Sequence, residues 1–278
     1  MKRKLIKELN NLPEPPTNMI ELNKFKNDNI DSEKLMKLLE KDPLIVANIL
    51  KISNSSIFGF RTKVDTLSRA INLLGEKFVI SVAIGSSITQ NLNPNLIAYS
   101  STIHDFLFIS SLASNIVNVW INEIDSELKN ELLLPAFLQE IGKFIISSIL
   151  EDSGKIEEFS KRLKESEDVT STEESFVGYS CAKITASIFK KWNFSDNIVL
   201  PIAYTSDINN CPVDFRKKAQ ILEIIKILCD IKSPLSDENV QKALNKVILY
   251  NFETDKFINS IETIKSSMLI NSTFADKT

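Results

Sequence analysis

Apolar residues recur at spacings of three and four positions along most of this chain, with polar residues between them. That spacing places apolar side chains on one face of an α-helix, whereas a half-buried strand alternates at every second position. Only six glycines and nine prolines occur in 278 residues, which leaves little turn material for a sheet of many strands. The pattern therefore predicts an all-α fold, a multi-helix bundle with a sizeable core.

Helix-start signals divide the first third of the chain into short helices. Asp42 followed by Pro43 suits the start of one helix, because proline is well tolerated at the first helical position. That helix should end at Asn54, and its predicted apolar face comprises Leu44, Ala47, Ile49, Leu50 and Ile52. Neighbouring helices are predicted with Asp31 as one cap and Asp65 or Thr66 as another, the latter ending in a left-handed cap at Gly75.

Longer apolar patterns follow. Residues 101–120 predict one helix and residues 131–150 a central buried helix, although Pro135, Gln139, Glu140 and Lys143 interrupt its apolar face. Residues 151–173 are dense in charge and predict a solvated connection with one amphipathic helix. Ser171 and Glu174 have the spacing of a capping box for a helix that runs to Trp192. Further helices are expected within 198–204, 215–231, 240–249 and 257–269.

Charge and hydropathy exclude two classes of partner. The net charge is −3 and the five arginines are scattered, so the clustered positive charge that phosphate contacts need is missing, and we expect no nucleic-acid partner. Residues 78–103 carry no charge, but hydrocarbon would strand their asparagines and serines, so no membrane insertion is expected.

The N-terminal segment and the cysteines indicate the cellular compartment in which the protein is expected. Lys7 and Glu8 interrupt the N-terminal segment before a signal sequence could reach the necessary apolar length, so we expect a cytoplasmic protein. Cys181, Cys211 and Cys229 form no CxxC pair, and we expect reduced thiols, with Cys229 in the core.

One segment, Asp42–Gly75, goes beyond what helix periodicity requires, because it carries small, amide and aromatic residues at fixed positions. Three segments, this one included, carry a resemblance to a known family. They are Leu12–Pro16 (LPEPP), Asp42–Gly75 (DPLIVANILKISNSSIFGFRTKVDTLSRAINLLG) and Glu140–Lys143 (EIGK). Together they resemble the HDOD family, a degenerate relative of the HD phosphohydrolases. The resemblance implies an N-terminal helical subdomain, residues 1–95, packed on an HD-like helical subdomain, residues 96–278.

The resemblance also locates the positions where an HD-type hydrolase holds its metal ions with imidazoles and carboxylates. Gln139 and Glu140 stand in place of the His-Asp pair, and Cys181, Thr205 and Ser206 stand where relatives carry histidines. His104 occupies a position where the family often has a histidine, and it is the single histidine of the chain. The resemblance therefore implies a protein that is not an enzyme and has no metal site and no cofactor.

The residues themselves leave both structural and functional interpretations open. Glu140 in an apolar helix needs a partner, and Lys143 is three residues away on the same side. His104 is interpreted as a helix-surface histidine. Asn54, Ser55 and Phe58 are explained by helix ending and by burial of the Phe58 ring, yet the same loop could be a contact surface. The candidate ligand or contact region comprises Asn54, Ser55, Phe58, Arg61, His104 and Glu140.

These observations favour a non-catalytic HDOD signal-transduction protein that acts through contacts with a protein partner. The expected setting is bacterial regulation, such as motility control or cyclic-dinucleotide-linked signalling. The alternative is a nucleotide or small-ligand sensor that uses a metal-free HD-like pocket. The sequence leaves the partner's identity and the oligomeric state open.

Overall fold

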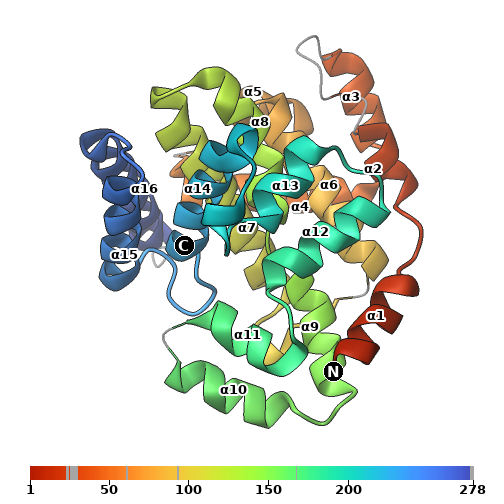
Figure 1. Ribbon diagram of the computed structural model, residues 1–278. Helices are drawn as coiled ribbons and strands as arrows, with labels where there is room; N and C mark the ends of the chain where they lie inside the picture. The colour runs from red at the N-terminus through yellow and green to blue at the C-terminus, as the bar shows by residue number, and fades with distance from the viewer. Residues whose placement is uncertain (23–24, 26–30, 61, 93, 167, 276–278) are drawn as a thin grey trace.

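The computed structural model describes residues 1–22, 25, 31–60, 62–92, 94–166 and 168–275, and its arrangement is shown in Figure 1. Every regular element in those ranges is helical, which confirms the all-α prediction. In chain order the α-helices are α1 Lys2–Asn10, α2 Thr17–Leu22, α3 Ser32–Leu39, α4 Pro43–Ser53, α5 Leu67–Leu74, α6 Glu76–Leu92, α7 Ile103–Trp120, α8 Ser126–Leu138, α9 Gly142–Glu151, α10 Ile156–Glu165, α11 Val169–Val177, α12 Cys181–Lys191, α13 Asp196–Ala203, α14 Val213–Leu228, α15 Asp237–Leu249 and α16 Thr254–Ala275, with short 3₁₀ helices between some of them.

Helices α6, α7 and α8 form the centre of the bundle. α7 packs along α8, and α6 packs against both α4 and α8. α14 contacts α7, α8 and α13, while α15 and α16 form an outer pair on one side (Figure 1). The predicted division at residue 95 stays a prediction.

The N-terminal caps of the short helices are confirmed. The Asp42 carboxylate accepts hydrogen bonds from the backbone N–H groups of Leu44 and Ile45, at 3.0 and 3.2 Å, and Pro43 begins α4. Asp31 caps α3 and Thr66 caps α5 in the same way. Each cap satisfies donors that the first helical turn leaves unpaired.

Two details of these helices differ from the prediction. The buried face of α4 follows Ile45, Ile49 and Ile52, so Leu44 and Ala47 lie on its exposed side. Gly75 ends α5 with φ +84° but ψ 151°, which is an extended conformation with positive φ and not a left-handed helical cap.

The uncharged stretch that begins at Phe78 falls largely within the central helix α6, which ends at Leu92. All its residues from Phe78 to Thr89 are buried. The hydroxyls of Ser81 and Ser87 donate to the carbonyls of Lys77 and Ala83, so these polar groups are satisfied within the helix. Burial on all sides by other helices explains why this segment carries no charge.

Among the described residues, one helical stretch, Ser126–Glu151, is long and apolar enough to cross a membrane by length and composition. Its most apolar window is 89% buried inside the protein. The pair α5 and α6 passes the same test only if joined, and it is bent by 119°. Such burial is the behaviour of core helices in a packed domain.

Two predicted helices are each split in the structure. Residues 131–150 do not form one helix, because a turn at 139–141 separates α8 from α9. The predicted helix from Ser171 to Trp192 is broken at Gly178, whose φ of +87° ends α11. The capping box predicted at Ser171 is absent, because Asp168 caps α11 and accepts the Ser171 hydroxyl. The solvated connection does contain the expected amphipathic helix, α10, with Phe159 and Leu163 buried.

The N-terminal segment is fastened to the end of α12. The Lys191 ammonium donates to the backbone carbonyls of Leu9 and Asn10, at 2.8 and 2.7 Å. The Trp192 indole N–H donates to the carbonyl of Pro13 at 3.0 Å. Trp192 itself is 5% exposed, so its ring is part of the core. The proline-rich segment Leu12–Pro16 is therefore part of the folded domain.

Helices α6 and α8 pack closely against each other at Gly85. A Cβ atom placed on Gly85 would lie 2.1 Å from Cε1 of Phe137, which is itself fully buried. Only a residue without a side chain allows this approach.

Gly85→Ala is predicted to lower the free energy of unfolding by about 1–3 kcal/mol, because the added methyl overpacks the α6–α8 contact. Phe137→Leu alone should also destabilise the protein by removing ring atoms from the core. The double variant should lose less than the sum of the two single variants, as measured by urea unfolding. Strictly additive losses would show that Phe137 is not the residue that excludes a side chain at position 85.

Candidate functional site

The segment after α4 is held by Asn54. Its amide group donates to the carbonyls of Leu50 and Val64, both at 2.7 Å, and its oxygen accepts from the Val64 N–H at 2.8 Å. Asn54 thus closes the end of α4 and fixes the loop that follows. This agrees with its interpretation as a helix-ending residue.

Phe58 is half-buried, so the prediction of a buried ring is wrong in degree. Its ring stacks on Phe60 and meets Phe78 edge-on, with centroids 5.8 and 5.3 Å apart. The neighbouring Ile57 is the side chain that enters the core, with 1% exposure. Phe58 therefore lies at the margin of the core, where an aromatic group covers apolar surface.

The C-terminal helix α16 covers the other side of this loop. The short 3₁₀ helix Ser56–Phe58 packs on α16, and a Cβ atom on Gly59 would lie 3.1 Å from Cβ of Ser267. Gly59 also has φ +62°, a left-handed conformation that glycine adopts without strain. Arg61, another candidate residue, lies outside the described residues.

Ser55 and His104, far apart in sequence, line one groove between α4 and α7. The groove has a volume of about 210 Å³. Its apolar walls include Ile52, Leu107 and Phe108, and its polar lining is Asn48, Lys51, Ser55, His104 and Ser111. The His104 side chain is 57% exposed, as expected for a helix-surface histidine.

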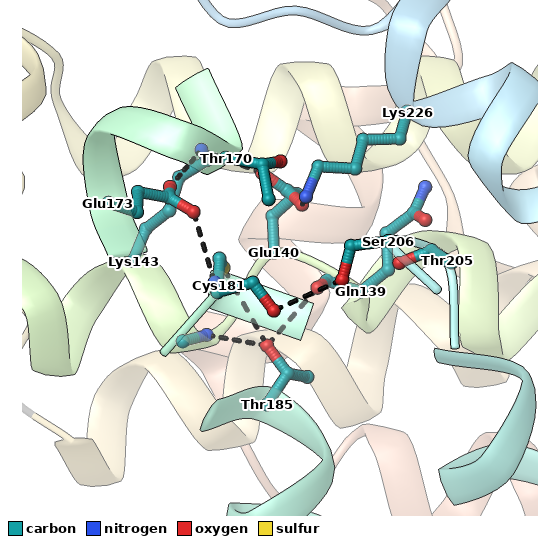
Figure 2. A network of polar contacts seen from close by, with 12 residues as sticks. Gln139, Glu140, Lys143, Thr170, Glu173, Cys181, Thr185, Thr205, Ser206 and Lys226 are labelled. Carbon is teal, nitrogen blue, oxygen red and sulfur yellow. Dashed lines mark hydrogen bonds and ion pairs between the residues drawn. The ribbon is translucent and has the colours of Figure 1, made fainter. Parts of the chain in front are cut away.

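A second site lies where α9, α11, α12 and α14 meet the turn between α8 and α9. Figure 2 shows gathered there the five residues that the resemblance assigns to metal positions: Gln139, Glu140, Cys181, Thr205 and Ser206. The turn is fixed by Thr185, whose hydroxyl donates to the Gln139 carbonyl and accepts from the Gly142 N–H. His104 is not among these residues.

Four charged side chains occupy this second site, which we call the buried charge cluster: Glu140, Lys143, Glu173 and Lys226. The Lys143 ammonium lies 2.8 Å from Oε2 of Glu140 and 3.1 Å from Oε1 of Glu173, which confirms the predicted Glu140–Lys143 pair. Lys226 reaches in from α14 and places its ammonium 3.3 Å from Oε1 of Glu140. Two cations thus face two carboxylates.

The surroundings of the cluster hold these charges in place. Glu173 is fully buried and accepts hydrogen bonds from the Tyr99 hydroxyl at 2.9 Å and from the Cys181 N–H at 3.0 Å. The Lys143 ammonium also lies 4.6 Å from the centroid of the Tyr99 ring. Each buried carboxylate therefore has partners from more than one helix.

Burial and pairing act against each other on the pKa values. Burial alone would raise the pKa of Glu140, but the charges of Lys143 and Lys226 outweigh it and lower that pKa below its ordinary value. Burial alone would lower the pKa of Lys143, and Glu140 and Glu173 hold it well above its ordinary value. The opposite charges therefore favour the ionised forms of Glu140 and Lys143.

Sequence reasoning missed Glu173 and Lys226. Glu173 falls within the predicted solvated connection, but its side chain is buried on the inner face of α11. There Lys143 and Tyr99 compensate its burial. Lys226 stands between buried isoleucines at 224 and 225 and a half-buried Ile227. A lone lysine within an apolar helical run is the one signal that could have identified it.

The cluster does not fit the metal centre of an HD-type hydrolase. Its carboxylates already bind ammonium groups, and Gln139 offers an amide where a transition metal prefers an imidazole. Burial, followed by the nearby Glu140 and Glu173, raises the pKa of the Cys181 thiol, whereas a metal binds the thiolate. Across the described ranges no group of three histidine, cysteine, aspartate or glutamate side chains is arranged to hold an ion.

Comparison with known proteins identifies the family. The HDOD domain model matches residues 12–208. No curated protein matches this chain.

Solved structures share the fold at low sequence identity. An HDOD domain protein of unknown function from Geobacter sulfurreducens is 17% identical with a TM-score of 0.64, covering 98% of this chain and 95% of that one. A candidate phosphohydrolase from Shewanella amazonensis is 20% identical with a TM-score of 0.65, covering 98% of each chain. A candidate signal transduction protein from Marinobacter aquaeolei is 16% identical with a TM-score of 0.65, covering 96% of this chain and 61% of that one. At such identities the likeness shows the fold alone.

The ionised state of Glu140 leads to a pH-dependent prediction. Glu140→Gln leaves Lys226 without its carboxylate and should cost about 3–5 kcal/mol of unfolding free energy near neutral pH. Because the pKa of Glu140 is lowered in the folded state, its stabilisation is complete above the ordinary value of 4.5 and is lost as pH falls through the folded-state pKa. The gap between wild type and variant should therefore narrow in strongly acidic solution.

Urea unfolding from neutral to strongly acidic pH measures this gap. Glu158→Gln is the matched control, because Glu158 pairs with Lys155 but its side chain is 63% exposed. Its effect should stay below about 1 kcal/mol. A Glu140→Gln gap that does not change with pH would mean that Glu140 is not ionised in the folded protein.

Proposed function

This chain belongs to the HDOD family, and we propose that it is a non-catalytic signal-transduction protein of bacteria that acts by binding a protein partner. The buried charge cluster is the observation that supports this proposal most directly. A metal hydrolase needs carboxylates and imidazoles that are free to bind ions and activate water. Here Lys143 and Lys226 neutralise Glu140 at the corresponding place.

The size of the space beside the cluster weighs against the alternative of a nucleotide sensor. The cavity lined by Gln139, Glu140, Lys143 and Lys226 has a volume of about 20 Å³. That is room for about one water molecule, whereas pockets for small organic ligands span about 300–1,000 Å³. A contact on the protein surface is better supported than a ligand in the HD-like pocket.

The groove between α4 and α7 is the face that we assign to the partner. Interfaces commonly place an apolar anchor of one protein in a pocket of the other. The groove has apolar walls, and its polar lining includes Lys51 and His104. None of the described residues that line it is acidic. It suits an apolar side chain flanked by a carboxylate. Ser55 and His104 of the candidate contact region belong to it, while α16 covers the loop at Gly59.

The non-catalytic part of the proposal predicts that the purified protein carries no stoichiometric transition metal and hydrolyses no phosphodiester. The variant with Gln139→His and Glu140→Asp should behave in the same way, because Lys143 and Lys226 remain and Cys181 stays protonated. Elemental analysis and a phosphodiester assay on both proteins measure this. Near one metal ion per chain in the wild type, or turnover by either protein, would overturn it.

If the partner binds in the groove between α4 and α7, charge reversal there should abolish binding. The double variant Lys51→Glu, His104→Glu should lose the proteins that co-purify with the wild type from the source cell, since a carboxylate of the partner would meet like charge. Lys183→Glu, an exposed site on α12 outside the groove, should keep them. Equal melting temperatures are required of all three proteins. Retention of every partner by the groove variant would refute the assigned face.

A further inference from the structure

Lys226 is an unusual residue for its position. It lies on α14 among isoleucines, and its side chain is only 16% exposed. Burying an ammonium is costly unless a carboxylate compensates it. A lysine buried on an apolar helix is favourable when a nearby carboxylate would otherwise be uncompensated.

The opposite charge is that of Glu140 and Glu173. Lys143 alone would have to serve both carboxylates, which would leave one net negative charge among Phe106, Phe137 and Cys229. Lys226 brings the cluster to neutrality. Figure 2 shows its side chain extending toward Glu140 from the side opposite Glu173.

The contact between Lys226 and Glu140 is an ion pair and not a formed hydrogen bond. Within the described part of the chain, the Lys226 ammonium, Oε1 of Glu140 and Oε1 of Gln139 have no hydrogen-bond partner. All three residues line the cavity of about 20 Å³. A cation site requires oxygen acceptors around a small space. It also requires an excess of negative charge when the cation itself is not counted.

We infer that Glu140 and Gln139 form a site for a primary ammonium ion, and that its resident cation is the side chain of Lys226. The cation is tethered to α14 and so cannot be exchanged for a free ion. α14 begins at Val213, beyond the family match that ends at residue 208, so the C-terminal segment supplies a charge that the HD-like core needs. This inference holds whether or not the protein acts through a partner.

Removing the tether tests the site. Lys226→Ala deletes three methylene groups and the ammonium, and n-propylammonium has the size to replace them. The Lys226 side chain is partly exposed, so n-propylammonium has an entry route. The variant should lose about 10 °C in melting temperature, because one buried partner is removed. Adding n-propylammonium chloride at tenfold excess over its dissociation constant should restore about 3–5 °C compared with sodium chloride at equal ionic strength.

Lys226→Met is the matched control, because it fills the same volume without charge. It should be destabilised but gain nothing from n-propylammonium, and the wild type should gain nothing either. If Lys226→Met melts at the wild-type temperature, or if n-propylammonium raises Lys226→Ala no more than Lys226→Met, the inference is wrong.

A second measurement serves if Lys226→Ala does not fold. Adding Glu140→Gln to Lys226→Met removes both charges, so the double variant should melt above Lys226→Met alone. A double variant that melts lower than Lys226→Met would also refute the site, because it would show that Glu140 does not need a cation.

Discussion

The mutual neutralisation of four buried charges constrains the rest of this structure. A carboxylate or an ammonium in an apolar interior is unfavourable alone, and a pair is tolerated only when geometry and further hydrogen bonds compensate the loss of water. Glu140, Lys143, Glu173 and Lys226 come from the turn before α9, from α9 itself, from α11 and from α14. These elements must therefore assemble together, and none can move far without exposing an unpaired charge to the core.

Local chemistry made much of the fold predictable. The Asp31, Asp42 and Thr66 caps depend on a side chain and the backbone two or three residues away, so the sequence alone reveals them. The split between α8 and α9 was missed, because its turn is stabilised by Thr185 from a distant helix. The apolar face of α4 was misplaced for a related reason: which apolar residues are buried depends on where α6 lies, and periodicity allows neighbouring stripes.

The candidate site was predictable only in part. The resemblance brought Gln139, Glu140, Cys181, Thr205 and Ser206 to one place, and spacing alone suggested Lys143 as a partner of Glu140. Glu173 and Lys226 could not be assigned in this way, because their partners are 30 and 86 residues away from them in sequence. A charged residue looks the same in a sequence whether it faces water or an opposite charge. Only the tertiary arrangement distinguishes the two environments.

The fastening of the N-terminal segment to α12 has a consequence for biosynthesis. Trp192 donates to the carbonyl of Pro13 across 179 positions of sequence. At translation rates of about 5–20 residues per second, the ribosome needs roughly 9–36 s to make the chain between these two residues. During that time Pro13 and the carbonyls of Leu9 and Asn10 have no native partner on α12. These carbonyls are thus translated long before their partners on α12, and they depend on solvent or on a chaperone for that interval.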